Sequence, residues 1–234
     1  MTKPLHVADV KEVIYSQERW KLFNELRKRA LELMIPLVKA GFDPIVHGSL
    51  ARGDVHKRSD VDIFVPRTIP SYKVELVLDE AGFETLKREI VMATPWQLPK
   101  AHIYIEENRS ITFPLLEPKP LELEFYHFGG TVGVEHVKKS IRVPGIDKRL
   151  MLVEPTPRGH VESPVIRREA EAAKRVGVSL DIVRERVQVL TRRAEIGHSG
   201  IFIKRELAPG ESFETVLRDL IKKNPAVKLR FKRK

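Results

Sequence analysis

Two short apolar runs, each joined to polar residues, constrain this chain most. The first ends in Gly48-Ser49, and the second carries Asp60-Val61-Asp62 after ten intervening residues. Side chains two residues apart in a strand point to the same face, so the two aspartates are predicted to present their carboxylates side by side. Mg²⁺ takes such oxygen ligands and binds phosphates at the same time. A glycine lets backbone approach a ligand, and a serine hydroxyl donates to phosphate oxygens. The pattern therefore predicts a phosphate-binding turn followed by a metal-binding strand.

Residues 44–66 resemble the signature of the DNA polymerase beta-like nucleotidyltransferase superfamily: Gly-Ser, about ten residues, then Asp-x-Asp between apolar residues. The resemblance implies transfer of a nucleotidyl group from a nucleoside triphosphate, with release of pyrophosphate. It implies two Mg²⁺ ions, with Mn²⁺ as an alternative metal, held by Asp60 and Asp62. Gly48 and Ser49 would hold the terminal phosphates. Arg52 lies close enough in sequence to add a bidentate phosphate contact, or to be surface charge.

The resemblance also implies a third acid on a neighbouring strand. Residues 121–128 alternate apolar residues with Glu122, Glu124 and Tyr126, which predicts a half-buried strand with two acids on its polar face. Either glutamate could approach the aspartates. We favour Glu124 as the third catalytic and metal-binding acid, because members of the superfamily place this acid just before a mostly apolar or aromatic run, and residues 125–128 fit that pattern.

The periodicity predicts a mixture of helices and strands, an α+β fold. The resemblance implies that they form the superfamily's small mixed sheet flanked by helices. Helices are expected over residues 16–40, 49–53, 73–81 and 211–223, and strands over 44–47, 61–65, 88–93, 101–106, 111–116 and 121–128. Residues 144–164 are rich in proline and read as a connector. We therefore expect a nucleotidyltransferase domain with its connector over residues 1–160 and a second domain over 161–234.

Composition narrows the class of protein. The 234 residues are 42% hydrophobic and 32% charged, which fits a folded globular chain rather than a disordered one. No apolar stretch approaches the roughly 20 residues that span a bilayer, and residues 1–6 lack the apolar core of a signal peptide. The absence of cysteine excludes disulfides and thiolate metal sites. We expect a cytoplasmic protein with no membrane partner.

The positive charge gathers in the second half of the chain. Residues 165–234 hold 18 Lys and Arg against 9 Asp and Glu, a net charge of +9 out of +10 for the whole chain. Residues 169–187 resemble a helix-turn-helix, with Ser179 as the cap of its second helix. Residues 200–207 would be the wing of a winged variant. The second helix would present four arginines to nucleic acid: Arg184, Arg186, Arg192 and Arg193. A helical bundle that only braces the first domain remains the alternative.

These observations favour a Mg²⁺-dependent nucleotidyltransferase that acts on a nucleic acid, with RNA favoured over DNA because residues 48–53 resemble CCA-adding enzymes. One alternative is a transferase that adenylylates a protein. The other is a non-catalytic regulator that joins a transferase fold to a DNA-binding module. The sequence specifies neither the base, nor the acceptor, nor the oligomeric state.

Overall fold

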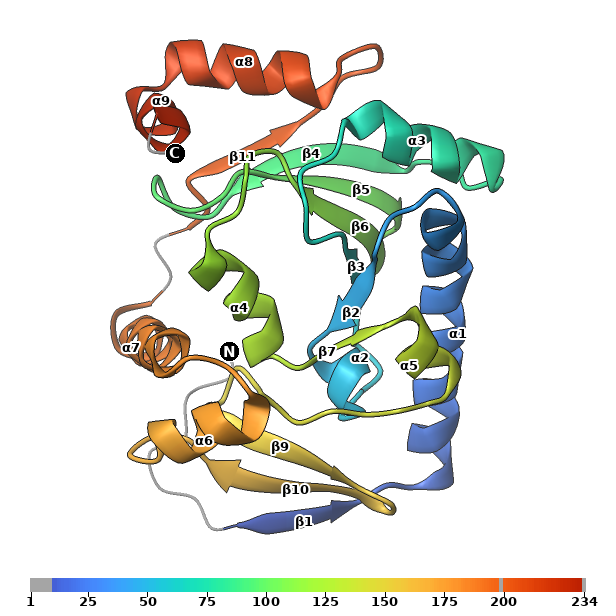
Figure 1. Cartoon of the computed structure of the whole chain (residues 1–234), viewed down its shortest axis with the longest axis vertical. Coiled ribbons are helices and arrows are strands. Elements are labelled where there is room, and N and C mark those ends of the chain that lie inside the picture. Colours follow the sequence, from blue (N-terminus) through green and yellow to red (C-terminus); the bar gives the residue numbers. More distant parts are fainter. Residues whose placement is uncertain (1–9, 198–199, 233–234) are drawn as a thin grey trace. The chain divides into compact units, whose positions relative to one another are not determined.

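The computed structural model of the chain describes residues 10–197 and 200–232 (Figure 1). These residues form a mixed α+β structure, which confirms the predicted fold class. They pack into two compact units, each assembled from separate stretches of chain. Unit 1 contains residues 10–31, 46–59 and 123–197, and unit 2 contains residues 32–45, 60–122 and 200–232. The prediction that residues 1–6 lack the apolar core of a signal peptide concerns residues outside the described part of the chain.

Unit 1 contains an antiparallel sheet with the strand order β1-β10-β9-β8. The strands are β1 (Lys11–Ile14), β10 (Gly159–Pro164), β9 (Met151–Thr156) and β8 (Gly145–Ile146). The prediction of a connector over residues 144–164 is therefore wrong. Its prolines lie in the turn between β9 and β10 or near strand ends, where a missing N–H group costs little pairing. Gly159 allows β1 to approach, since a Cβ there would stand 1.9 Å from the Val13 carbonyl oxygen.

Helices and two short strands complete unit 1. Helix α1 (Gln17–Lys39) confirms the helix predicted over residues 16–40. It begins in this unit and continues into unit 2. Its buried stripe is apolar at Phe23, Leu26, Ala30, Leu33, Met34 and Leu37. The other elements are β2 (Ile45–His47), α2 (Ser49–Arg52), α4 (Pro120–Phe128), β7 (Thr131–Gly133), α5 (Val134–Lys138), α6 (Glu169–Val176) and α7 (Leu180–Ile196). Strand β2 and helix α4 each lie partly in unit 2 by sequence.

Unit 2 contains a mixed sheet with the strand order β11-β4-β5-β6-β3. The strands are β11 (Ile203–Glu206), β4 (Lys87–Met92), β5 (Lys100–Glu106), β6 (Arg109–Pro114) and β3 (Val61–Phe64). The pairs are antiparallel except β3 with β6, which are parallel. The strands predicted over 61–65, 88–93, 101–106 and 111–116 are thus confirmed.

The two faces of this sheet differ in chemistry. One face is apolar and buried, with Ile63, Ile111 and Ile103 in neighbouring strands. Helices α3 (Ser71–Glu80), α8 (Phe213–Lys223) and α9 (Pro225–Lys232) complete the unit. Phe213 of α8 packs against Phe113 with ring centroids 5.9 Å apart. The other face carries a polar row across four strands: Asp62, Ser110, Tyr104 and Lys87.

The predicted strand over residues 121–128 is wrong, because this stretch is helix α4. Pro120 begins the helix, a position where its missing N–H group is not needed. The Glu122 carboxylate accepts a hydrogen bond from the Lys119 N–H group at 2.9 Å and so caps the first turn. Tyr126 and Phe128 are buried, whereas the leucines that suggested alternation are only half-buried. The cap and the buried aromatic residues therefore favour a helix, although the polarity of this stretch alternates with the two-residue period of a strand.

The stretch after residue 160 is divided between the units. Helices α6 and α7 belong to unit 1, whereas β11, α8 and α9 belong to unit 2. The expected wing is wrong, because β11 pairs with β4 at the edge of the unit 2 sheet. The domain boundary at residue 160 stays a prediction, since compact packing and independent folding are different properties. Among the described helices, none has the length and apolar character needed to cross a membrane.

Candidate functional site

The Gly48-Ser49 turn joins β2 to α2 in unit 1, as predicted. Gly48 has φ 68° and ψ −141°, a conformation that favours glycine. Its N–H group donates to the Gly130 carbonyl oxygen at 3.0 Å, which holds the turn against the loop after α4. Within the described part of the chain, no heavy atom lies within 4 Å of the place where a Cβ on Gly48 would stand. The turn is thus fixed on one side and open on the other.

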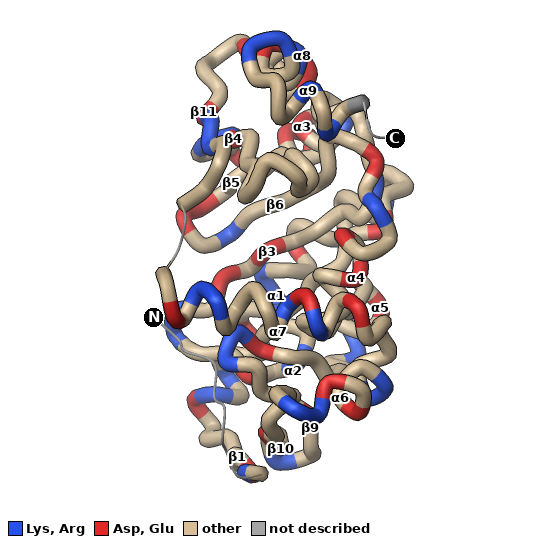
Figure 2. The backbone as a smooth tube through the Cα atoms, turned by 90° about the vertical axis from the view of Figure 1, so that its left-hand side faces the viewer, with Lys and Arg blue, Asp and Glu red and all other residues tan. Residues whose placement is uncertain are grey.

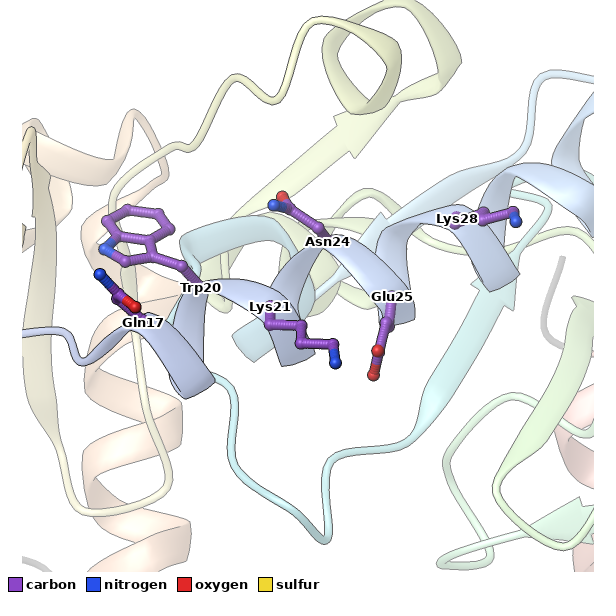
Figure 3. A pocket seen from close by; sticks show the side chains of 6 residues that line it. All are labelled: Gln17, Trp20, Lys21, Asn24, Glu25 and Lys28. Carbon is purple, nitrogen blue, oxygen red and sulfur yellow. The ribbon is translucent and has the colours of Figure 1, made fainter.

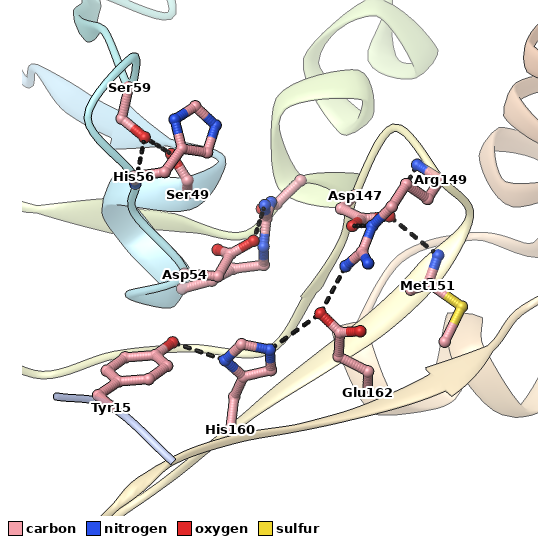
Figure 4. A network of polar contacts seen from close by, with 12 residues as sticks. Tyr15, Ser49, Asp54, His56, Ser59, Asp147, Arg149, Met151, His160 and Glu162 are labelled. Carbon is pink, nitrogen blue, oxygen red and sulfur yellow. Dashed lines mark hydrogen bonds and ion pairs between the residues drawn. The ribbon is translucent and has the colours of Figure 1, made fainter. Parts of the chain in front are cut away.

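The Ser49 hydroxyl is half-buried and lies beside a second serine. Ser49 Oγ donates to Ser59 Oγ at 3.4 Å, and Ser59 Oγ accepts from the His56 N–H group at 3.0 Å (Figure 4). The bond between the hydroxyls is long, so a phosphate oxygen could replace Ser59 as the acceptor. The phosphate contact of Ser49 stays a prediction.

Arg52 is 5% exposed and makes its contacts inside unit 1. Its guanidinium donates to the Gly129 carbonyl oxygen at 2.6 Å and to Asp54 Oδ2 at 2.8 Å. Burial alone would raise the pKa of Asp54, but the Arg52 charge and hydrogen bond outweigh it and hold that pKa below its usual range. Arg52 thus braces the glycine loop, and a phosphate contact would require these bonds to break.

Arg27 of α1 supports the same turn and was not identified from the sequence. It is 3% exposed and donates to the carbonyl oxygens of Leu50 and Ala51 at 3.1 and 3.2 Å. Burial, and then the nearby charge of Arg142, lowers the pKa of Arg27 to about 10, so it stays charged at neutral pH. The only feature of the sequence that could have indicated this role is the position of Arg27 within the apolar stripe of α1.

The aspartate pair lies in unit 2, where Asp60 directly precedes β3 and Asp62 lies on it. Asp60 is exposed and Asp62 is half-buried. Ser110 of β6 stands opposite Asp62 and donates its hydroxyl to Asp62 Oδ1 at 2.6 Å. Tyr104 lies close to both carboxylates: burial first, then the charges of Glu89 and Asp62, raise the pKa of Tyr104 to about 12. The structure therefore surrounds Asp62 with polar groups on one sheet face.

The glutamates proposed as a third acid do not lie on the strand that pairs with β3. Both belong to α4, and Glu124 accepts a hydrogen bond from the Ser179 hydroxyl in unit 1. Glu122 forms an ion pair with Arg230 at 2.7 Å in unit 2. The described residues contain no cluster of three or more His, Asp or Glu side chains suited to a metal ion. The expectation of a third acid on a neighbouring strand is thus unsupported by the fold.

The predicted two helices and cap of residues 169–187 are present. Helix α6 ends at Gly177, which has φ 77°, and the Ser179 hydroxyl caps α7 by accepting from the Ile182 N–H group. The four arginines of α7 differ in exposure: Arg184 and Arg192 are exposed, Arg193 is half-exposed, and Arg186 is buried. Figure 2 colours Lys and Arg blue and Asp and Glu red along the backbone, and α6 carries both kinds of charge.

A buried polar network that sequence reasoning missed links β1 to β9 and β10 (Figure 4). The Tyr15 hydroxyl lies 2.6 Å from His160 Nδ1, and His160 Nε2 lies 3.0 Å from Glu162. Glu162 also accepts from Arg149, whose guanidinium binds Asp147. Arg149 and His160 hold the pKa of Glu162 below its usual range against the raising effect of burial. The network is internally paired, so we assign it a structural role.

A surface hollow runs along α1 in unit 1 (Figure 3). Its lining residues are Gln17, Trp20, Lys21, Asn24, Glu25 and Lys28. None of them belongs to the Gly48-Ser49 turn, and their charges are mixed. The hollow therefore gives no reason to place the reaction there.

Comparison with known proteins agrees with the two motifs. Residues 26–112 match a family model described as a nucleotidyltransferase domain, and this stretch contains both the Gly48-Ser49 turn and the aspartate pair. No curated protein and no solved structure matches the chain. The domain supports the transfer of a nucleoside monophosphate from a nucleoside triphosphate. The match supports a nucleotidyltransferase domain over residues 26–112 and covers less than half of the chain.

Proposed function

We propose that this protein transfers a nucleoside monophosphate from a triphosphate to a hydroxyl group of a nucleic acid, with RNA favoured over DNA. The observation that carries the proposal is the matched domain with both motifs intact, including two aspartates at i and i+2 around β3. The proposed substrate contacts are the Gly48 backbone and the Ser49 hydroxyl, which are suited to hydrogen bonds with phosphate oxygens. The basic residues of α7 favour a polyanionic acceptor.

The donor set of β3 fits Mg²⁺. Two carboxylates are sufficient protein ligands for this ion, because it keeps several waters and takes its remaining oxygens from substrate phosphates. Asp60 and Asp62 would hold it, and the absence of a larger acidic cluster among the described residues is consistent with such a site. When bound, Mg²⁺ lowers the pKa of the attacking hydroxyl and neutralises charge on the triphosphate. Mn²⁺ could take the same oxygen ligands.

Glu124 stays the third acid proposed from the sequence, although it lies on helix α4 and not on a neighbouring strand. Its carboxylate accepts a hydrogen bond from Ser179, so metal binding would compete with this bond. The substitution Glu124→Gln retains an acceptor for Ser179 and removes the charge. A loss of incorporation comparable to that of Asp62→Asn would support the metal role, and activity near that of the wild type would restrict Glu124 to joining α4 and α7.

Two alternatives make different use of the same residues. Adenylylation of a protein would use the same phosphate and metal contacts but would not need the arginines of α7. A non-catalytic DNA-binding regulator would need the helix-turn-helix. The segment predicted as a wing is instead a strand of the unit 2 sheet. One of the features that favoured the DNA-binding regulator is therefore absent.

The decisive experiment is incubation with each α-labelled nucleoside triphosphate, Mg²⁺ and total RNA. The variant with Asp60→Asn and Asp62→Asn should incorporate no label. Asp79→Asn changes the charge of an exposed aspartate on α3 and should behave as the wild type. Label in RNA with the wild type and Asp79→Asn establishes the transferase and identifies the nucleotide. Label only in protein favours adenylylation, and no label in either refutes the proposal.

A further inference from the structure

Arg186 of α7 differs from the other buried arginines in the described part of the chain. Arg27 and Arg52 donate to carbonyl oxygens, and Arg52 also to Asp54. Arg109 and Arg230 each form ion pairs with glutamates. Arg186 is only 6% exposed, yet within the described residues it forms no ion pair. Its buried Nε has no hydrogen-bond partner, as is also true of Arg52 and Arg230. Its guanidinium carbon lies 5.0 Å from the centre of the Phe125 ring.

A buried guanidinium without an anion is costly, because its charge has lost water and gained no partner. Burial first, and then the charge of Arg193, lowers the pKa of Arg186, while Glu185 raises it. Glu185 does not pair with it. Glu124, the residue before Phe125, accepts a hydrogen bond from Ser179. The structure therefore holds a cation that lacks a counter-ion from the described protein residues.

The surroundings of Arg186 suit one kind of anion. Arg193 is seven residues further along α7, on the same side of the helix, and is half-exposed. Phe125 is 38% exposed and presents part of an aromatic ring beside Arg186. A guanidinium binds phosphate oxygens through two parallel N–H groups, and an aromatic ring stacks on a base. Together these groups match a nucleotide better than a simple anion.

We propose that Arg186, Arg193 and Phe125 form a nucleotide-phosphate subsite between α4 and α7 in unit 1. Its phosphate would come from the nucleoside triphosphate or from the backbone of the acceptor strand. The identity of that nucleotide as a substrate rests on the proposed function, but binding at the subsite does not. The subsite does not include the Gly48-Ser49 turn or the aspartate pair.

The test measures binding in the absence of transfer. All proteins carry Asp60→Asn and Asp62→Asn and are measured in EDTA, so neither metal nor turnover contributes. ATP binding is measured by calorimetry, and binding of a labelled ten-nucleotide oligouridylate by fluorescence anisotropy. The variants are Arg186→Gln, Arg186→Lys and the matched control Arg158→Gln, which removes an exposed arginine charge from unit 1 outside α7.

We expect Arg186→Gln to weaken binding of at least one ligand by about tenfold or more, because a hydrogen bond to a charged group is lost. The affinity of Arg186→Lys should lie between those of the parent and Arg186→Gln. Arg158→Gln should change either affinity by no more than about twofold, because an exposed charge contributes little. A loss for ATP alone identifies the triphosphate as the phosphate source, and a loss for the oligonucleotide alone identifies the strand. Equal effects of Arg186→Gln and Arg158→Gln on both ligands would overturn the subsite.

Thermal melting separates binding from folding. Without ligand, Arg186→Gln should melt no lower than its parent, because it removes an unpaired buried charge. Its rise in melting temperature with ligand should be smaller than that of the parent. If Arg186→Gln does not fold, the same binding and melting measurements are made on Arg186→Lys and Phe125→Leu. Weaker binding at an unchanged melting temperature supports the subsite, and unchanged binding overturns it. Binding without label transfer would refute only the proposed function.

Discussion

Gly48→Ala isolates backbone strain at the phosphate-binding turn. The conformation of Gly48, φ 68° and ψ −141°, is nearly inaccessible to residues with a Cβ. The added methyl group meets no described heavy atom within 4 Å, so a steric clash does not contribute. Forcing alanine into such a conformation costs about 1–3 kcal/mol. For a chain of this size, that corresponds to a fall in melting temperature of about 2–12 °C.

Gly133→Ala is the matched control within the same unit. Gly133 has φ −85° and ψ 179°, which any residue adopts, and it too has open space where a Cβ would stand. Its substitution should change the free energy of unfolding by less than about 1 kcal/mol. Urea denaturation of the wild type and both variants measures the difference. If Gly48→Ala and Gly133→Ala are equally stable with equal m-values, the turn is not held in the strained conformation and the reasoning fails.

Three further predictions concern the supports of unit 1. Arg27→Met should destabilise the fold by about 1–3 kcal/mol in urea denaturation, because two α2 carbonyl oxygens lose a charged donor; no loss would show that water replaces the donor. The pKa of Asp54 is lowered on folding, so its contribution to stability is present above the unperturbed pKa of 3.8 and is lost as the pH falls toward the folded value. Asp54→Asn should therefore flatten stability against pH below about pH 4, and an unchanged acid limb of the denaturation profile would contradict this. Gly159→Ala should cost about 1–3 kcal/mol by forcing β1 away from β10, whereas a melting temperature equal to that of Gly133→Ala would refute the close contact with Val13.

The sequence predicted most of the elements that carry the two motifs. The helix over 16–40, the strand before Gly48 and the strand that carries Asp62 all follow local rules, namely an apolar stripe or a short apolar run beside glycine. The cap at Ser179 and the turn at Gly177 were predicted for the same reason. Local patterns were sufficient where one short segment determined its own geometry.

The errors arose where distant segments decide the structure. Residues 121–128 alternate in polarity, but a proline start and the Glu122 cap make them a helix. Residues 203–206 were expected to be a wing, yet they complete a sheet edge with β4, more than one hundred residues earlier. Arg186 was expected on an exposed face and is buried against Phe125. Each outcome depends on a partner that no local pattern identifies.

The spacing between the two motifs has a physical explanation within unit 1. After Ser49, the chain makes the single turn of α2 and reverses at Gly53, which has φ 99°. It then returns to Ser59, which is 5% exposed and accepts both the His56 N–H group and the Ser49 hydroxyl. The first and last residues of this segment are therefore joined by a hydrogen bond, although ten positions separate them in sequence. An insertion or deletion would move Ser59 away from Ser49 and alter where β3 begins. The separation of Gly-Ser from Asp-x-Asp is thus set by a closed loop, and the aspartates follow from its last residue.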